Sequence, residues 1–309
     1  MATRSCDFIP RLEPNRRAKT AFGAALVAAL CSMVPASAAR ADCTMQIVGN
    51  DLLIDGCNVR VTNGTGSTAT TNGLGNLILG YDEPRSNTTE ADRAGSHNLV
   101  VGMLHHYSSY GGFVAGRQNT LSGPFASVAG GGQNTASGNR ASVSGGQNNT
   151  AQGDYSSVSG GTTNWADGSY SSVTGGQSNT ALAATSSISG GESNTTGDAK
   201  NPGRSAVASS ISGGTGNAAI SNDSSVSGGV GNLASGQGAS VSGGRRSEAH
   251  GQYSSIVGGD SNTATGSSSA VSGGFANTAS GTAAAVSGGA HRSATGSNNW
   301  TAGWLNQVQ

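Results

Sequence analysis

Charged and aromatic residues are both scarce in this sequence. Asp, Glu, Lys and Arg make up 10% of the 309 residues, and Phe, Trp and Tyr make up 5%. Residues 1–41 hold six of the 16 basic residues and two of the 16 acidic ones, so the remainder carries ten basic against fourteen acidic groups. A weakly acidic chain lacks the basic surface that binds phosphate backbones, and we expect no nucleic-acid partner.

Recognisable catalytic motifs are absent as well. The sequence has no nucleophile elbow, no His-x-x-x-His pattern on a helix and no phosphate-binding loop. His97, His105 and His106 lie close together in the chain, but no carboxylates stand at metal-ligand spacing around them. We therefore expect a protein that is not an enzyme and that needs no cofactor and no metal.

Long apolar runs are limited to the N-terminus. Basic residues precede an apolar run at 21–34, and Ala39-Arg40-Ala41 follows it, which is the pattern of a secretory signal peptide over residues 1–41. Cleavage after Ala38 is the alternative, and the route is either Sec or twin-arginine. The run is too short for a permanent anchor, so we expect an exported protein, extracellular or on the outer cell surface, with no transmembrane anchor of its own.

Cysteine is also rare, because two of the four cysteines fall within the predicted signal peptide. Cys43 and Cys57 are left in an exported chain, where a disulfide is the expected state. Short strands are predicted at Gln46–Val48, Asp51–Ile54 and Asn58–Thr62. We interpret residues 42–74 as a segment that caps the end of the repeats described next.

Glycine, by contrast, is abundant at 51 residues, and it belongs to a repeat of the form Ala-Ser-Val-Ser-Gly-Gly-x-x-Asn-Thr-Ala-x-Gly, as in 141–153. The branched residue recurs at a spacing of 14, then 15 four times, then 23, then 15 five times. It occupies Val114, Val128, Val143, Val158, Val173, Ile188, Ile211, Val226, Val241, Ile256, Val271 and Val286. A fixed period of this kind indicates a solenoid.

Each repeat is too short for a strand and a helix, so it predicts two short strands and two turns per coil. In Ser142-Val143-Ser144 the pleat turns the valine inward and both serines outward, and the later alanine, such as Ala151, shares the interior. The Gly-Gly pair suits a corner that needs positive φ or close backbone approach. Asn six residues after the branched position predicts an Asx-type turn, stacked from coil to coil as a ladder.

Two segments resemble a known repeat: Ser-Val-Ala-Gly-Gly-Gly at 127–132 and Val-Ala-Gly-Arg-Gln-Asn-Thr-Leu-Ser-Gly at 114–123. They are similar to the YadA-like (Hep/Hag) head repeat of trimeric autotransporter adhesins, over roughly residues 98–303. The resemblance implies an all-β fold, a left-handed parallel β-roll, and three chains that bury their apolar faces on a common axis. One Val and one Ala per coil make a thin interior, which also favours association along one face. We thus expect a homotrimer. The heptad stalk and membrane anchor of that family are not found here.

The repeat domain is predicted to span 75–303, followed by a tail at 304–309 that would help cover the last core layer together with Trp300. Two charged excursions interrupt the period, at 81–96 and 197–204. Insertions in repeat proteins map to loops that often bind partners, so the candidate partner contacts are Arg85, Arg93, Lys200 and Arg204. A tolerated surface insertion is the alternative.

Aromatic residues share one register, three positions before the branched residue, at Phe125, Tyr155, Tyr170 and Tyr253. They suit either sugar stacking or the padding of a corner. Our leading hypothesis is an exported, non-catalytic, adhesin-like or structural surface protein whose ligand is a host surface, a matrix or a polysaccharide. The alternative is a monomeric β-solenoid that binds ice or polysaccharide through Ser, Thr and Asn ladders. A polysaccharide-cleaving β-helix ranks third, because it needs converging carboxylates.

Overall fold

The computed structural model describes residues 43–85, 90–198 and 207–302. The predicted signal peptide at 1–41 and the tail at 304–309 lie outside them. The chain divides into two compact units, 1–59 and 60–309, and each is described by itself.

The first unit contains an antiparallel hairpin of β1 (Thr44–Val48) and β2 (Asp51–Asp55). Gly49 closes it with a positive φ of 63°, and a Cys43–Cys57 disulfide joins the flanking residues with a Cα–Cα distance of 4.9 Å. The predicted disulfide and the first two strands are confirmed. The strand predicted at 58–62 is wrong: the segment is irregular, and Val59 and Val61 are 68% and 43% exposed, because no described strand pairs with it.

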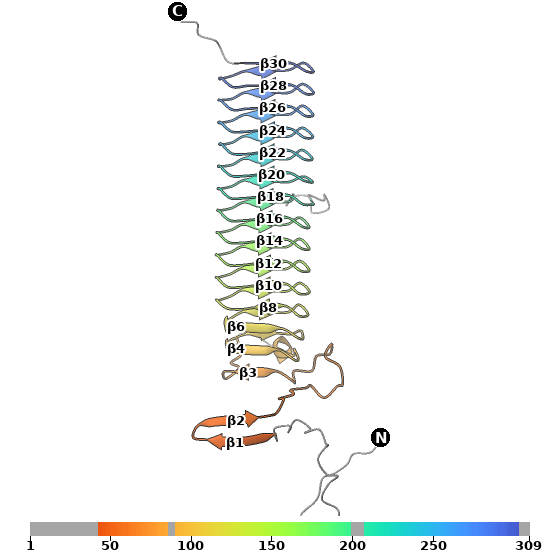
Figure 1. The fold of residues 1–309 in the computed structure, drawn as a ribbon, viewed down its shortest axis with the longest axis vertical. Coiled ribbons are helices and arrows are strands. Elements are labelled where there is room, and N and C mark those ends of the chain that lie inside the picture. Colours follow the sequence, from red (N-terminus) through yellow and green to blue (C-terminus); the bar gives the residue numbers. More distant parts are fainter. Residues whose placement is uncertain (1–42, 86–89, 199–206, 303–309) are drawn as a thin grey trace, which may run out of the picture. The chain divides into compact units, whose positions relative to one another are not determined.

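The second unit is a parallel β-solenoid (Figure 1). Among the described residues, its first sheet contains fifteen strands. They are β3 (Leu77–Leu79), β4 (Leu99–Met103), β6 (Phe113–Arg117), β8 (Ser127–Val128), β10 (Ser142–Val143), β12 (Ser157–Val158), β14 (Ser172–Val173), β16 (Ser187–Ile188), β18 (Ser210–Ile211), β20 (Ser225–Val226), β22 (Ser240–Val241), β24 (Ser255–Ile256), β26 (Ala270–Val271), β28 (Ala285–Val286) and β30 (Trp300–Thr301).

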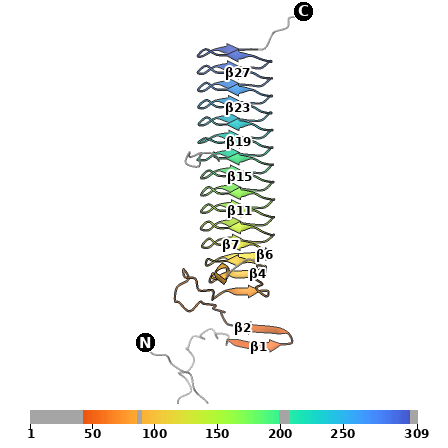
Figure 2. The same cartoon turned by 180° about the vertical axis from the view of Figure 1, so that it is seen from behind.

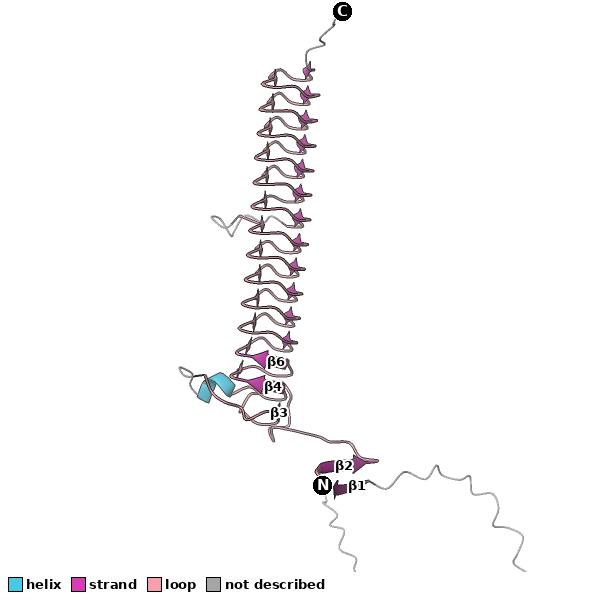
Figure 3. Cartoon of the chain, turned by 90° about the vertical axis from the view of Figure 1, so that its left-hand side faces the viewer, coloured by secondary structure: helices cyan, strands magenta, loops and turns pink. Residues whose placement is uncertain are grey.

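The second sheet, seen from behind in Figure 2, contains thirteen strands within the described ranges. They are β5 (His106–Tyr107), β7 (Thr120–Leu121), β9 (Thr135–Ala136), β11 (Thr150–Ala151), β13 (Trp165–Ala166), β15 (Thr180–Ala181), β17 (Thr195–Thr196), β19 (Ala218–Ala219), β21 (Leu233–Ala234), β23 (Glu248–Ala249), β25 (Thr263–Ala264), β27 (Thr278–Ala279) and β29 (Ser293–Ala294). A 3-10 helix, η1 (Glu90–Arg93), lies beside the first coils (Figure 3). The all-β fold with two strands per coil is confirmed.

Equivalent residues of successive coils pair in exact register. Val143 pairs with Val128 and with Val158 in the first sheet, and Ala151 pairs with Ala166 in the second. Single-residue parallel bridges run along a third line, from Arg117 through Gly132 to Ala290. Each coil therefore bonds to its neighbours along three lines.

Turns are tight because several residues of each coil adopt the left-handed conformation. In the coil of Val143 these are Gly146, Asn148 and Tyr155, with φ of 83°, 55° and 58°. A Cβ added to Gly146 would lie 2.2 Å from the carbonyl oxygen of Gly161 in the next coil, whereas one added to Gly145 would meet nothing within 4 Å. In this Gly-Gly pair, only the second glycine has the predicted need for positive φ and close approach.

The interior consists of columns of small side chains. The branched residues from Val114 to Val286 and the alanines after them, such as Ala151, are at most 1% exposed, as predicted. A further inward position was missed. It lies two residues before the branched one and holds Ser or Ala, for example Ser156 at 1% and Ala141 at 1%.

The coils stack without a break past the insertion after Ile188. Ser187 pairs directly with Ser210, and Thr195 pairs with Ala218. The predicted start of the second excursion needs a correction, because Gly197 belongs to the coil and its N–H donates to the carbonyl of Ala219 at 2.9 Å. The eight residues that exceed the period are therefore 199–206, which lie outside the described residues.

The last described coil also needs a correction. Thr301 does occupy the branched position and pairs with Val286, as predicted. Trp300, however, lies at the outward position before it and is 68% exposed. It does not cover the core; its indole N–H donates to the Ser287 hydroxyl at 2.6 Å.

Candidate functional site: the outward surfaces of the solenoid

The asparagine column is an internal ladder and not a surface. Asn164 is 1% exposed, and its side-chain N–H groups donate to the carbonyls of Gly160 and Gly176, both at 2.9 Å. Its Oδ1 accepts the backbone N–H of Asn179 in the next coil at 3.0 Å. The predicted ladder is confirmed. Because the amides are buried and bonded on both sides, they are not available to an external ligand.

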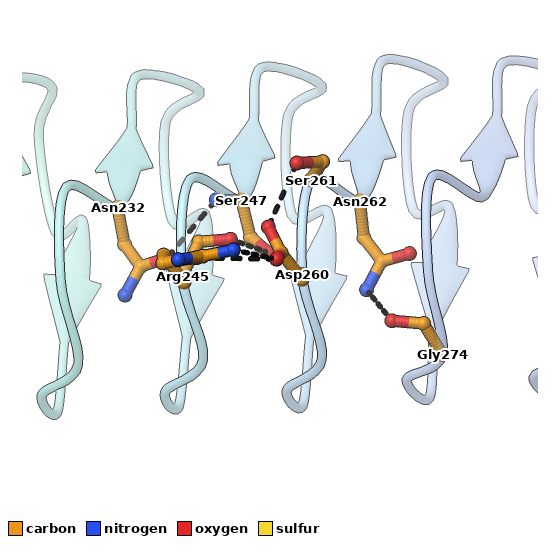
Figure 4. A network of polar contacts seen from close by, with 7 residues as sticks. All are labelled: Asn232, Arg245, Ser247, Asp260, Ser261, Asn262 and Gly274. Atoms are coloured by element: carbon orange, nitrogen blue, oxygen red, sulfur yellow. Dashed lines mark hydrogen bonds and ion pairs between the residues drawn. The ribbon is translucent and has the colours of Figure 1, made fainter.

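The ladder changes character where asparagine is replaced (Figure 4). Ser247 donates its backbone N–H to Asn232 Oδ1 at 3.0 Å, but its hydroxyl reaches only its own coil, at Arg245 O, 3.4 Å away. On the outside of the same coils Arg245 Nη2 bonds to Asp260 Oδ2 at 2.6 Å. Hydrogen bonding from Arg245 lowers the pKa of Asp260. An exposed ion pair thus joins the same two coils, those of Ser247 and Asn262, between which the internal amide is missing.

The outward face of the first sheet is a grid of hydroxyl groups. The residues on either side of the branched position both carry a hydroxyl in seven successive coils: Ser142 and Ser144, Ser157 and Ser159, Ser172 and Thr174, Ser187 and Ser189, Ser210 and Ser212, Ser225 and Ser227, and Ser240 and Ser242. Strand geometry separates the rows by about 4.8 Å and the two hydroxyl positions of one coil by about 6.6 Å. The register Ser187↔Ser210 carries the grid past the insertion. We call this surface the hydroxyl face.

The outward face of the second sheet is less regular. Its outward column begins with His106, continues with Thr120, Thr135 and Thr150, and then holds Trp165. Farther along it holds Leu233 and Glu248. Trp165 is 42% exposed. The two faces therefore differ, and only the hydroxyl face repeats one chemistry over many coils.

One corner carries a stack of aromatic rings and an arginine. Tyr155 and Tyr170 are parallel, with an interplanar angle of 6° and centroids 4.9 Å apart. The Arg140 guanidinium lies between Phe125 and Tyr155, 5.5 Å and 5.3 Å from their ring centroids. Within this group, Arg140 and the neighbouring ring occupy the faces of Tyr155, which favours the padding of a corner there. Tyr170 and Tyr253 remain 59% and 60% exposed, so sugar stacking stays open for them.

The first charged excursion is bonded to the coils. Arg85 donates to the carbonyls of Leu104, at 2.8 Å, and of Gln118. Arg93 Nη1 donates to Asp82 O at 2.6 Å and pairs with Asp82 Oδ2 at 3.1 Å. Both candidate contact arginines therefore have intramolecular partners. Their contact with an external partner stays a prediction, and Lys200 and Arg204 lie outside the described residues.

The buried Tyr107 and the half-buried His106 also meet this excursion. Tyr107 donates its hydroxyl to Asp82 Oδ2 at 2.9 Å, and burial together with that bond raises the pKa of Tyr107. His106 Nε2 lies 3.6 Å from Asp92 Oδ1. Within the described parts of the chain, no three His, Cys, Asp or Glu side chains converge as metal ligands. The residues around the excursion hold a loop in place.

His105 has a structural position that the sequence analysis did not predict. It is 3% exposed and takes a position of the ladder, where its ring nitrogens contact Val101 O at 3.0 Å and the Asn119 N–H at 3.3 Å. The signal that could have found it is the spacing. His105 follows Val100 by five residues, as Asn119 follows Val114.

Comparisons with known proteins do not identify a family for this chain. No protein-family model matches the chain, and no curated protein matches it. Among the described residues there is no helix long and apolar enough to span a membrane. The solenoid implied by the resemblance is confirmed, and membership of the adhesin family remains a proposal.

Proposed function

We propose that the protein is an exported, non-catalytic scaffold that acts in an adhesin-like or structural role on the cell surface or outside the cell. One observation carries the proposal: both sheets continue in register past the insertion after Ile188. A stack that keeps its register across an insertion in the sequence is suited to presenting inserted segments. In this proposal the repeated coils supply rigidity, and the excursions are the segments that are presented.

The test is to locate the full chain in cells that express it. Antibody labelling of intact cells, together with analysis of the medium, should detect the chain outside, with an N-terminus near Asp42 and no free thiol from Cys43 or Cys57. A cytosolic protein followed in the same cells controls for lysis. A full-length chain that still carries residues 1–41 and stays in the cytosol would contradict the proposal.

The homotrimer that the resemblance implies is part of this proposal. Its support is confined to the first coils, where Leu77 and Leu79 are 51% and 54% exposed on the outward side of β3. In the coils from Val143 to Val241 both of the equivalent outward positions carry hydroxyls. Light scattering on the purified mature chain decides the point, because a mass of one chain would exclude the trimer.

The second candidate is a monomeric solenoid that binds ice or polysaccharide, and the hydroxyl face favours it. The hydroxyls from Ser142 to Ser242 are regular and free of charged neighbours in their rows. Ice adsorption and pull-down with insoluble polysaccharide should both be run with Ser172→Lys/Ser187→Lys and with the opposite-face control Thr150→Lys/Thr180→Lys. Loss of binding in the first variant alone would favour this candidate, and no binding by the unchanged protein would exclude it.

A further inference from the structure

An imidazole replaces an amide in the internal ladder of the first coils. We call the coils from Val128 onward, which repeat every 15 residues apart from the insertion, the array. The coil from Val100 to Val114 is one residue shorter, and His105 stands where the next coil has Asn119. Like the asparagines, His105 contacts a carbonyl of its own coil and an N–H of the next coil. It therefore makes two of the three contacts of a ladder asparagine, with a group that can be protonated.

The two partners determine which nitrogen of His105 carries the proton. Val101 offers a carbonyl, which can only accept, so Nε2 is the donor at 3.0 Å. Asn119 offers its backbone N–H, which can only donate, so Nδ1 is the acceptor at 3.3 Å. Only the neutral imidazole with its hydrogen on Nε2 satisfies both partners. A second proton, on Nδ1, would face the Asn119 N–H donor to donor.

The charges around this ring make protonation still less favourable. Arg85 bonds to the carbonyls of Leu104 and Gln118, the residues immediately before His105 and Asn119. Burial lowers the pKa of His105 and the Arg85 charge adds to this, against the backbone hydrogen bonds, which raise it. Asp92 is the nearby carboxylate, and it lies against His106.

We propose that His105 makes the first coils of the solenoid sensitive to acid, so that its protonation breaks the ladder at Asn119 and frees the loop at 81–85 and 90–96 from the coils. The same Arg85 that holds the loop on Leu104 and Gln118 would then stand beside a second cation. Ladder positions of the array hold Asn, Ser or Arg, none of which titrates in this range, so the effect stays local.

The direction of the pH dependence follows from the lowered pKa. The unfolded chain takes up the proton on His105 near the ordinary value of about 6.5, whereas the folded chain takes it up only at a lower pH. The contribution of His105 to stability is therefore complete above about pH 6.5 and is lost as the pH falls below it. As the pH falls from about 6.5 to 5.5, the opening equilibrium rises, by at most about tenfold.

Amide hydrogen exchange on the full mature chain, corrected for intrinsic rates, tests this between about pH 7.5 and 5.5, a range above that in which carboxylates normally titrate. Protection of Asn119 and of peptides covering 98–121 should fall, by at most about tenfold, while Asn149 and Asn164 keep theirs. Equal behaviour of the two regions would overturn the proposal.

Two variants make the result specific. His105→Asn restores the amide found at Asn119 and should abolish the pH dependence of 98–121. His106→Asn, next to it but facing Asp92, should leave that dependence in place. Nitrogen NMR of the histidine rings gives an independent readout: at neutral pH His105 should carry its proton on Nε2. A proton on Nδ1, or an unaltered pH dependence in His105→Asn, would contradict the mechanism.

Discussion

The first coils and the later array of the solenoid solve the same stacking problem with different chemistry. In the array, one buried amide per coil links neighbours, as Asn149 links to Asn164 and Asn164 to Asn179. In the first coils the links are individual: His105 bonds to Asn119, Tyr107 to Asp82, and Arg85 to Leu104. Repetition gives a stack in which any coil can replace another, whereas individual pairs fix one loop at one place.

Core volume differs in the same way. The position filled by alanine in the array, as at Ala151, is filled by Tyr107 and Leu121 in the 14-residue coils, and both are buried. Larger interior side chains bury more apolar surface per coil. The first coils therefore depend more on burial, and the array depends more on its hydrogen-bonded ladders.

The strongest way to break the array is at the second glycine of the corner. Gly146→Val places a β-branched residue at a φ of 83°, with its Cβ 2.2 Å from the carbonyl of Gly161. Left-handed strain and overpacking should together cost about 3 kcal/mol, and the thermal midpoint measured by circular dichroism should fall clearly. Gly145→Ala, with nothing within 4 Å of the new Cβ, is the matched control. Equal melting of the two variants would show that the corner can relax.

A smaller loss is expected from removing one ladder amide. Asn164→Ala deletes three hydrogen bonds and leaves the Gly160 carbonyl and the Asn179 N–H without their side-chain partner. Buried groups left unpaired should cost about 2 kcal/mol. Chemical denaturation of the variant, compared with Gln152→Ala on the exposed side of the same coils, measures it. If both variants lose equally little, the ladder is not what stabilises the array.

The array could be predicted from the sequence because its period assigns each residue a fixed place. Val143, Ala151 and Asn149 recur at one spacing, so strand geometry alone decides which of them face inward. The inward serine column at Ser156 was missed because Ser142 and Ser144, the serines nearest the valine, face out. Alternation also places the residue two positions before the valine inward, but serine is mostly an exposed residue type, and that preference argued against it.

The first coils could not be predicted in this way because their side-chain contacts join residues at large and irregular sequence separations. Arg85 bonds to residues 19 and 33 positions later, and no local pattern marks such partners. The charged composition of 81–96 marked a real feature, but it gave no sign of the internal hydrogen bonds of Arg85 and Arg93; their contact with an external partner stays a prediction. His105 shows the same limit, because its ladder role appears only when the shorter coil is aligned at five residues after Val100.

The finest test of the comparison is to repair the array instead of breaking it. Ser247 interrupts the ladder between Asn232 and Asn262, and the surrounding corner has the usual geometry: Gly244 has a φ of 90°, and its Cβ position lies 2.2 Å from Gly259 O. An amide at residue 247 would find the carbonyls of Gly243 and Gly259 and the N–H of Asn262 where every intact coil has them. Ser247→Asn should therefore stabilise the protein by about 1 kcal/mol, the net value of a buried hydrogen bond after the cost of ordering the longer side chain.

The matched experiment on the outer surface of the same two coils is Arg245→Ala. It removes the ion pair with Asp260, and because that pair is exposed its loss should be hard to detect and should shrink further as salt is added. Thermal unfolding of the single and double variants separates the two contributions. A stabilising Ser247→Asn combined with a silent Arg245→Ala would mean that the internal amide, and not the surface charge, sets the strength of each step. The reverse result would make the ion pair a functional replacement for the missing amide, and the array would then share with the first coils a dependence on individual side-chain pairs.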